Sequence, residues 1–273
     1  MHCAFYTKIL YMILNSINWN VDPEIFNWGF LSVRYYGLFF AMGFMAGFYI
    51  LERMFKSEGI KQEWLDKIFM YVVIATIVGA RLGHVIFYGW DYYSQHLGDI
   101  IKIWEGGLAS HGGAIGIIVA IYFYSKKVSK KSMVWAMDRL LVPVALAGMF
   151  IRLGNLMNSE IYGHVTELPW GFIFERRGEE LAKHPTQLYE ALCYLITFVV
   201  MFFSYWKTKA KEKQGLLFGM FLIGVFGSRF MIEFVKENQE TWEQDMTFNM
   251  GQLLSIPFVI AGIYFIYNAI KKK

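Results

Sequence analysis

The segment from Arg152 to Gly163 places an arginine, two asparagines and a glutamate within twelve residues, RLGNLMNSEIYG. The residues around it are so apolar that these polar groups have no obvious place among lipid-facing side chains. A charged side chain at the centre of a bilayer costs roughly 2.5 to 3.5 kcal/mol on insertion scales, so its presence is by default a sign of function. Because arginine binds phosphate through a planar fork of donors, the segment predicts a site for an anionic phospholipid.

The composition supports a membrane protein. Of the 273 residues, 56% are hydrophobic, 19% are aromatic and 18% are charged, whereas about 25% of the residues in a soluble domain are charged. The two cysteines, Cys3 and Cys193, show neither a disulfide framework nor metal-ligand spacing. We therefore expect no metal, no cofactor and no nucleic-acid partner.

Seven apolar runs are long enough, or nearly so, to be interpreted as membrane-spanning helices. They lie near Ser32–Leu51, Ile68–Tyr88, His111–Ser125, Leu140–Asn158, Pro185–Trp206, Gly215–Phe234 and Asn249–Ile270. We predict an all-α integral membrane protein, a bundle of about seven transmembrane helices, formed by residues 22–273 as a single transmembrane helical domain. Residues 1–21 are expected to be an N-terminal extension, whose apolar stretch Ile9–Ile17 is about half a span and is interpreted as interfacial.

Basic residues alternate between the two sides of this topology. They gather after the first, third and fifth spans and at the carboxyl terminus: Arg53, Lys56, Lys61, Lys67, Lys126, Lys127, Lys130, Lys131, Arg139, Lys207, Lys209, Lys211, Lys213 and Lys271–Lys273. The other connections carry only Lys102 and Lys236, apart from the segment Gly163–His184, which has three basic residues. Because Lys and Arg collect on the cytoplasmic side, we expect the amino terminus outside and the carboxyl terminus in the cytoplasm.

The polar residues of the spans all fall at their outer ends under this orientation. They are Arg34, Tyr36, Arg81, His84, His111, Arg152, Asn155, Asn158, His184, Gln187, Arg229, Glu233, Asn249 and Gln252. Packed as a bundle, the helices would bring these groups to one site in the outer half of the bilayer. If the helix continued through Gly163, then Arg152, Asn155, Glu160 and Gly163 would share an arc of about 140°, whereas a loop would lose that alignment.

Six motifs, in the same order, resemble those of the bacterial prolipoprotein diacylglyceryl transferases. Besides RLGNLMNSEIYG they are RYYGL with Tyr35–Gly37, GARLG at Gly79–Gly83, GGLASHGGAIG at Gly106–Gly116, HPTQLYE at His184–Glu190 and GSRFMIEF at Gly227–Phe234. The resemblance covers the chain from about Asp22 to the carboxyl terminus, whereas the first 18 or so residues do not share it.

The resemblance implies an enzyme of the bacterial plasma (inner) membrane, with its active site toward the outer leaflet. It would transfer the diacylglyceryl group of phosphatidylglycerol to the thiol of the lipobox cysteine of a preprolipoprotein and release glycerol phosphate. The leaving phosphate gains negative charge during this reaction. Preorganised arginines would stabilise that charge most strongly in the transition state.

The resemblance also implies roles for particular residues. His111 would be the base that activates the thiol, although it could instead cap the third span and bond to a neighbouring helix. Arg152 and Arg229 would bind the phosphate, although internal ion pairs are the alternative, Arg229 with Glu233 and Arg152 with Glu160.

Other motif residues would shape the headgroup site. Asn155, Glu160 and Gly163 are expected there, with helix capping as the competing interpretation. Gly112 and Gly113 would allow close approach of lipid or of another helix.

Tyr36 is placed in the catalytic group as a donor to the lipid, or else in the interfacial aromatic belt. Arg81, Glu233 and His184 are assigned supporting roles.

Other classes of membrane protein fit less well. A retinal photoreceptor needs a lysine in its last helix, and Asn249–Ile270 has none; an intramembrane serine protease needs a serine motif such as GxSxG, which Ser110 and Ser228 lack. A transporter or flippase of an anionic lipid or solute stays open. Such a protein would be expected to show paired broken helices or an internal repeat, and we find no repeat.

Overall fold

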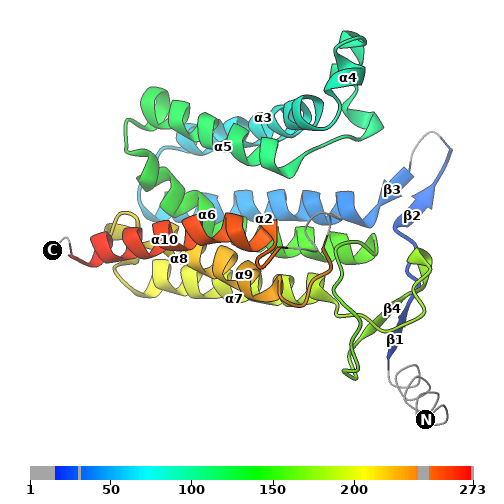
Figure 1. The fold of residues 1–273 in the computed structure, drawn as a ribbon. Helices are drawn as coiled ribbons and strands as arrows, with labels where there is room; N and C mark the ends of the chain where they lie inside the picture. Colours follow the sequence, from blue (N-terminus) through cyan, green and yellow to red (C-terminus); the bar gives the residue numbers. More distant parts are fainter. Residues whose placement is uncertain (1–15, 30–31, 239–245, 272–273) are drawn as a thin grey trace. The chain divides into compact units, whose positions relative to one another are not determined.

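The computed structural model describes residues 16–29, 32–238 and 246–271, and the predicted interfacial segment Ile9–Ile17 lies almost wholly outside them. The chain forms two compact units, coloured along the sequence in Figure 1. Unit 1 comprises Met1–Gly47 and Leu140–Lys273, and unit 2 comprises Phe48–Arg139. We describe each unit by itself, and the assignment of residues 22–273 to a single domain stays a prediction.

Five helices are long and apolar enough to cross a membrane, with mean hydropathies from 1.4 to 1.9. They are α2 (Tyr35–Ser57), α3 (Gln62–Phe87), α6 (Met133–Met157), α7 (Thr186–Lys207) and α10 (Met250–Lys271). A span needs about 20 apolar residues, and each of these helices has at least 22. This confirms the predicted all-α, multi-pass membrane class.

Two of the seven predicted spans are helical but shorter. The third is α5 (Ser110–Tyr124), which has 15 residues and ends in a π-helical turn at Ser125–Ser129. The sixth is divided into α8 (Leu216–Leu222), a π-helical turn at Ile223–Gly227 and α9 (Ser228–Ile232). A π-helical turn shifts the register of the side chains that follow it, and such turns are frequent at functional sites.

Glycines set the closeness of the helix pairs in both units. In unit 2, a Cβ on Gly83 would lie 2.6 Å from the Cα of Gly112, so α3 and α5 touch backbone to backbone. In unit 1, a Cβ on Gly43 would lie 3.2 Å from the Cβ of Ala147, which brings α2 against α6. Small residues are the common means by which membrane helices approach closely.

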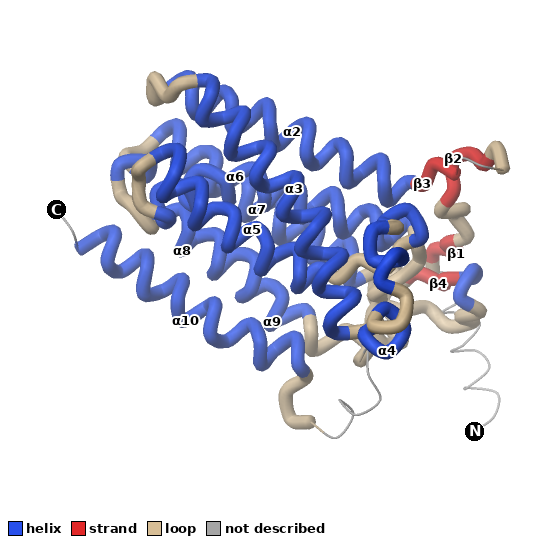
Figure 2. The backbone as a smooth tube through the Cα atoms, turned by 90° about the horizontal axis from the view of Figure 1, so that it is seen from above, coloured by secondary structure: helices blue, strands red, loops and turns tan. Residues whose placement is uncertain are grey.

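Two short sheets lie at one end of unit 1. Strand β1 (Ile17–Trp19) pairs in parallel with β4 (Phe172–Phe174), and β2 (Glu24–Asn27) pairs antiparallel with β3 (Ser32–Arg34). Figure 2 shows both sheets at the end of unit 1 where α2 begins. The prediction that the first span starts at Ser32 was wrong, because Ser32–Arg34 is a strand and the helix begins at Tyr35.

A small aromatic core fixes the β1–β4 sheet to the end of α6. Leu156, Phe172 and Phe174 are buried, with Trp19, Tyr162 and Leu188 packed against them. The Trp19 indole Nε1 donates a hydrogen bond of 3.0 Å to the Leu156 carbonyl. The segment after α6, which carries Glu160 and Gly163, is therefore held against a packed layer.

Candidate functional site

Five charged side chains meet at one end of unit 1, and we call them the ion cluster: Arg152, Glu190, Arg229, Glu233 and Lys236. Arg152 on α6 forms an ion pair with Glu190 on α7. The Lys236 ammonium lies 3.3 Å from the Glu190 carboxylate and 2.9 Å from that of Glu233. The Nε of Arg229 lies 3.3 Å from Oε1 of Glu233, so the ion pair that the sequence offered as an alternative is present.

Most of the ion cluster is withdrawn from solvent. The side chains of Glu190, Lys236 and Glu233 are 1%, 2% and 7% exposed, whereas that of Arg229 is 31% exposed. Buried charges are costly unless they are paired, and here three cations share two carboxylates. The ion cluster thus carries one positive charge in excess. Its most exposed member, Arg229, bonds through Nε alone among the described residues.

The start of α10 orients Glu233. Asn249 and Gln252 cap the helix reciprocally, through hydrogen bonds from the Asn249 N–H to the Gln252 side chain (3.1 Å) and from the Gln252 N–H to the Asn249 side chain (2.9 Å). The amide Nδ2 of Asn249 then donates to Glu233 Oε2 at 3.1 Å. Gly251 leaves the space for this carboxylate, because a Cβ there would lie 2.5 Å from the Glu233 Cδ.

The signature segment, residues 152–163, is part helix and part loop, so the loop alternative that the sequence left open applies to its second half. Helix α6 ends at Met157, so Glu160 and Gly163 leave the arc of Arg152 and Asn155. A chain of hydrogen bonds joins them instead. Arg152 donates to Asn155 at 3.2 Å, and Asn155 donates to Glu160 at 2.7 Å. Arg152 pairs with Glu190 rather than with Glu160.

Backbone strain surrounds Glu160. Ser159 and Ile161 have φ values of 51° and 63°, a left-handed conformation that is a genuine outlier for a β-branched residue. Residues held in this region cost about 1–3 kcal/mol each and persist only where their surroundings impose them. Thr186 and Gln187 impose it here, since their side chains donate to the carbonyls of Ile161 (2.8 Å) and Glu160 (2.7 Å).

At Gly163 the signature segment contacts two other segments of the chain. Its N–H donates to the His184 carbonyl at 2.8 Å, and it forms an isolated β-bridge with Lys236. A Cβ on Gly163 would overlap the Val235 carbonyl and lie 2.8 Å from the Cβ of His184. The absence of a side chain thus lets the signature segment, His184 and the end of the sixth predicted span meet.

Tyr36 lies at the beginning of α2 beside the signature segment. A Cβ on Gly154 would lie 2.8 Å from the Tyr36 ring, so this glycine makes room for the tyrosine. Tyr36 is also within electrostatic range of Glu160 and Arg152. Arg34 lies elsewhere, because it is in β3 and pairs with Glu24 at 2.9 Å with 62% of its side chain exposed.

Outside the helices, charged groups stabilise the loop before α7. Burial alone would lower the pKa of Lys183, but the carboxylates of Glu237 and Glu179 outweigh it and raise that pKa. For His184 the pKa is lowered, chiefly by burial and also by His164. The His184 Nδ1 lies 3.1 Å from the Tyr189 hydroxyl, and this contact holds the ring in place.

The remaining predicted site residues belong to unit 2. His111 is the second residue of α5, and its exposed side chain makes no hydrogen bond to the residues that the structure describes. Gly112 and Gly113 are buried, and Gly112 faces α3, as in the helix-packing interpretation. Arg81 is 4% exposed and donates to the carbonyls of Asp99, Ile100, Gly106 and Gly107, so it organises the loop before α5.

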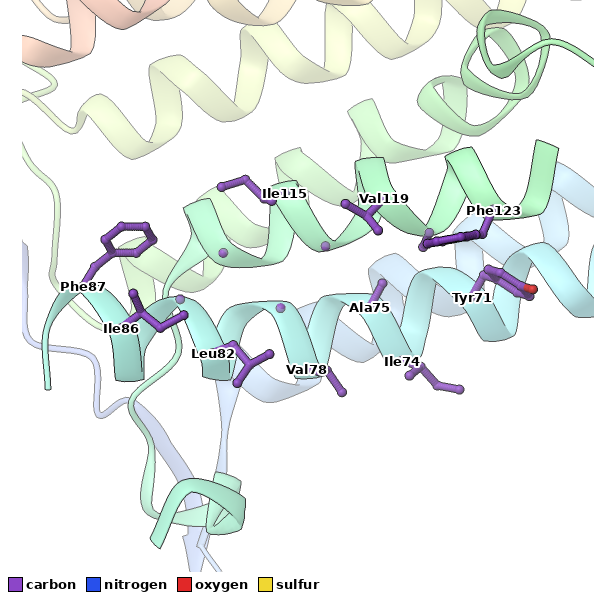
Figure 3. A pocket seen from close by; sticks show the side chains of 15 residues that line it. Tyr71, Ile74, Ala75, Val78, Leu82, Ile86, Phe87, Ile115, Val119 and Phe123 are labelled. Carbon is purple, nitrogen blue, oxygen red and sulfur yellow. The ribbon is translucent and has the colours of Figure 1, made fainter. Parts of the chain in front are cut away.

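An apolar groove of about 620 Å³ runs along α3 and α5. Figure 3 shows side chains of both helices lining it, among them Ile74, Val78, Leu82, Ile86, Ile115, Val119 and Phe123. Gly112, the neighbour of His111 in the sequence, is one of the residues that line the groove. Its lining matches the hydrocarbon interior of a bilayer.

Two members of the ion cluster were missing from the site predicted from the sequence. Glu190 ends the HPTQLYE motif three residues after Gln187, a helical spacing that places both on one face. Lys236 was counted as a basic residue of an outer connection, but its side chain is only 2% exposed. Its position three residues after Glu233 was the available signal. No group of three or more potential metal-ligating His, Cys, Asp or Glu side chains occurs among the described residues.

The structure is that of a multi-pass helical membrane protein with a buried ionic site that has an excess of positive charge. The sequence family described as prolipoprotein diacylglyceryl transferase matches residues 23–268. This protein therefore belongs to the prolipoprotein diacylglyceryl transferase family.

Several relatives match over nearly their whole length. The phosphatidylglycerol–prolipoprotein diacylglyceryl transferase of Porphyromonas gingivalis is 48% identical, over 93% of this chain and 95% of the relative. The proteins of the same name from Tolumonas auensis and Chloroherpeton thalassium are 46% and 43% identical, over 93% and 94% of this chain and 98% and 95% of theirs.

Proposed function

We propose that this protein transfers the diacylglyceryl group of phosphatidylglycerol to the thiol of the lipobox cysteine in a preprolipoprotein. The products are a thioether and glycerol phosphate. The observation that carries the proposal is the ion cluster, where Arg152, Arg229 and Lys236 share two buried carboxylates. One phosphodiester would balance the excess positive charge. The relatives bear this activity in their names.

The reaction is a displacement at the glyceryl carbon that carries the phosphate. The thiolate forms a carbon–sulfur bond while the carbon–oxygen bond breaks, and the electron pair leaves with glycerol phosphate. The phosphate passes from one negative charge toward two. Arg229, whose terminal nitrogens make no hydrogen bond to the described residues, is placed to take up that charge beside Arg152.

The carboxylates and Lys236 are assigned a positioning role. Glu190 orients Arg152, and Glu233 orients Arg229, so each guanidinium keeps other donors for the phosphate. Lys236 joins the two carboxylates and fixes their separation. Asn155, Glu160 and Gly163 shape the headgroup site, with Tyr36 as a further donor at its edge.

His111 is proposed to take the proton of the thiol. The motif and its exposed position at the start of α5 support this assignment. A thiol is only a few per cent ionised at neutral pH, so a positioned base would contribute roughly 10²- to 10⁴-fold. Gly112 and Gly113 are retained as its neighbours, and Arg81 and His184 as supporting residues.

We further propose a seven-span topology in the bacterial inner membrane, with the amino terminus outside. The ion cluster lies near the beginnings of α7 and α10, whereas Lys207 and Lys271 end these two helices. Because basic residues favour the cytoplasmic side, the ion cluster would face the outer leaflet. The short α5 and the divided segment Leu216–Ile232 would be the two additional spans.

A transfer assay tests the proposed function. The purified protein is incubated in detergent with phosphatidylglycerol and a lipobox peptide, and the peptide is analysed by mass spectrometry. We expect a mass gain of one diacylglyceryl unit and stoichiometric release of glycerol phosphate. An unchanged peptide, together with movement of the lipid between leaflets of vesicles, would support the alternative of a flippase or transporter.

A further inference from the structure

A second, polar pocket of about 330 Å³ adjoins the signature segment in unit 1. It is lined by residues 159–162 together with Arg177, Glu237 and Asn238. Its wall therefore combines two carboxylates, a guanidinium, an amide and two hydroxyls. Such a lining differs from the apolar groove of unit 2, because it offers both hydrogen-bond donors and acceptors.

Ser159 gives this pocket an unused hydrogen-bonding group. Its side chain is 1% exposed, yet the buried Oγ has no hydrogen-bond partner among the described residues. A buried hydroxyl left unpaired costs free energy, which a ligand would recover by pairing with it. The strained φ of 51° shows that the backbone is held in this unusual conformation at Ser159.

Arg177 binds the backbone of the loop at residues 158–159, beside the pocket. Its Nε donates to the Ser159 carbonyl at 2.9 Å and its Nη2 to the Asn158 carbonyl at 3.1 Å. The Nη1 group bonds to none of the described residues and is left for a ligand. Glu160 likewise accepts from Asn155 and Asn158 through Oε1, so its Oε2 remains available at the pocket wall.

The pocket is next to the proposed phosphate site. Glu160 lines it and also ends the hydrogen-bonded chain that begins at Arg152, through contacts of 3.2 and 2.7 Å at Asn155. A group esterified to a phosphate at Arg152 would extend past Asn155 to reach the pocket wall at Glu160. In phosphatidylglycerol that group is glycerol.

We propose that this pocket binds the hydroxyl-bearing glycerol of the phospholipid headgroup and that Ser159 contributes to headgroup selection. The inference rests on the proposed function. Carboxylates accept hydrogen bonds from hydroxyls, and Arg177 and Ser159 can donate to them. The hydroxyls of a glycerol can both donate to the carboxylates of this wall and accept from its guanidinium, which a headgroup without hydroxyls cannot do.

The experiment compares two lipid donors with two matched serine variants. Phosphatidylglycerol and phosphatidylethanol carry the same charge and the same acyl chains, but only the first has a diol. Ser159→Ala removes the hydroxyl in the pocket. Ser125→Ala is the control, because Ser125 is 4% exposed and its Oγ also lacks a hydrogen-bond partner in the described part of the chain, but it belongs to unit 2 and does not line the pocket.

The measured quantity is the donor ratio, kcat/KM with phosphatidylglycerol divided by kcat/KM with phosphatidylethanol. We expect the same donor ratio for wild type and Ser125→Ala. In Ser159→Ala that ratio should fall about fivefold or more, the effect of one lost hydrogen bond, while the rate with phosphatidylethanol is unchanged. An equal ratio in all three proteins would overturn the inference. A wild-type protein that lipidates the peptide from neither lipid would instead contradict the proposed function.

A second arm separates the lipid headgroup from the free product, because glycerol phosphate carries the same diol. Inhibition by added glycerol phosphate is measured for wild type and Ser159→Ala. A reduced donor ratio, with or without weaker product inhibition, supports binding of the lipid headgroup. Weaker product inhibition with an unchanged donor ratio would show that the pocket binds the released product only and would contradict headgroup selection.

Discussion

The ammonium of Lys236 lies 3.3 Å from the carboxylate of Glu190, and the two side chains are 2% and 1% exposed. They are 46 residues apart, so this pair ties the segment after α9 to the first half of α7. The pair therefore holds Arg152 and Glu233, which bind its two ends, at a fixed separation.

Replacing Glu190 by Gln should destabilise the protein strongly. It would leave Lys236 and Arg152 with an unbalanced buried charge, and breaking such a pair costs about 3–5 kcal/mol. The matched control is Glu63→Gln, which breaks an ion pair to Lys67 whose side chains are 65% and 48% exposed and should cost under about 1 kcal/mol. Thermal unfolding in detergent measures both. Similar shifts of Tm in the two variants would contradict a structural role for the buried pair.

Replacing Ile161 by Gly should separate activity from stability. Glycine adopts the φ of 63° without strain, which stabilises the folded state, but it also raises the conformational entropy of the unfolded chain. Because these two effects oppose each other, the free energy of unfolding should change by under about 1 kcal/mol. The transfer rate should fall about tenfold or more, because Glu160 is then less firmly positioned. Lys130→Gly, at φ 55° in unit 2, is the control and should keep the full rate. Equal rates in both variants would show that the strain has no part in the site.

Replacing Gly163 by Ala should disturb the junction of three chain segments. The added methyl would meet the Val235 carbonyl and the His184 Cβ, and overpacking of this kind costs about 1–3 kcal/mol. Gly98→Ala is the control, because nothing lies within 4 Å of its Cβ position. Unfolding and transfer should both be impaired in the first variant and unchanged in the second. A fully stable and active Gly163→Ala protein would contradict this account of the junction.

Acid should destabilise the protein partly through His184. Burial and His164 lower the pKa of this residue in the folded state, so the folded protein binds the proton less well than the unfolded chain. The stability is present above the unfolded pKa of about 6.5 and is lost as the pH falls through that value toward the folded pKa. His184→Gln should show a smaller decrease of Tm between pH 7.5 and 5.5 than wild type does. If the Tm of wild type and of His184→Gln decreased equally over this pH range, His184 would not contribute to the acid destabilisation.

Apolar run length and motif spacing predicted much of the architecture. Each predicted span has a helix in the structure, and the pair of Arg229 and Glu233 follows from a separation of four residues. The strand Ser32–Arg34 was missed because its residues adjoin an apolar run without a breaking signal. Periodicity within one segment cannot reveal pairing with a distant strand.

The site was less predictable, because its contacts join distant segments. Lys236 looks like an ordinary loop lysine in the sequence, and only the partners Glu190 and Glu233 explain its burial. The left-handed backbone at Ser159 and Ile161 was equally hidden, since neither residue type favours it. Side chains of α7 hold the carbonyls of Glu160 and Ile161, and Arg177 holds that of Ser159.

The most direct test of the central claim is the rate of diacylglyceryl transfer by Arg152→Lys and Arg229→Lys. Lysine keeps the charge but lacks the planar fork of donors, so an account based on guanidinium stabilisation of the leaving phosphate predicts that kcat falls about 10²-fold or more in each variant. Both variants must first unfold at a Tm close to that of the wild type. If the folded lysine variants transferred the lipid within about threefold of the wild-type rate, the proposed role of the two arginines would be contradicted.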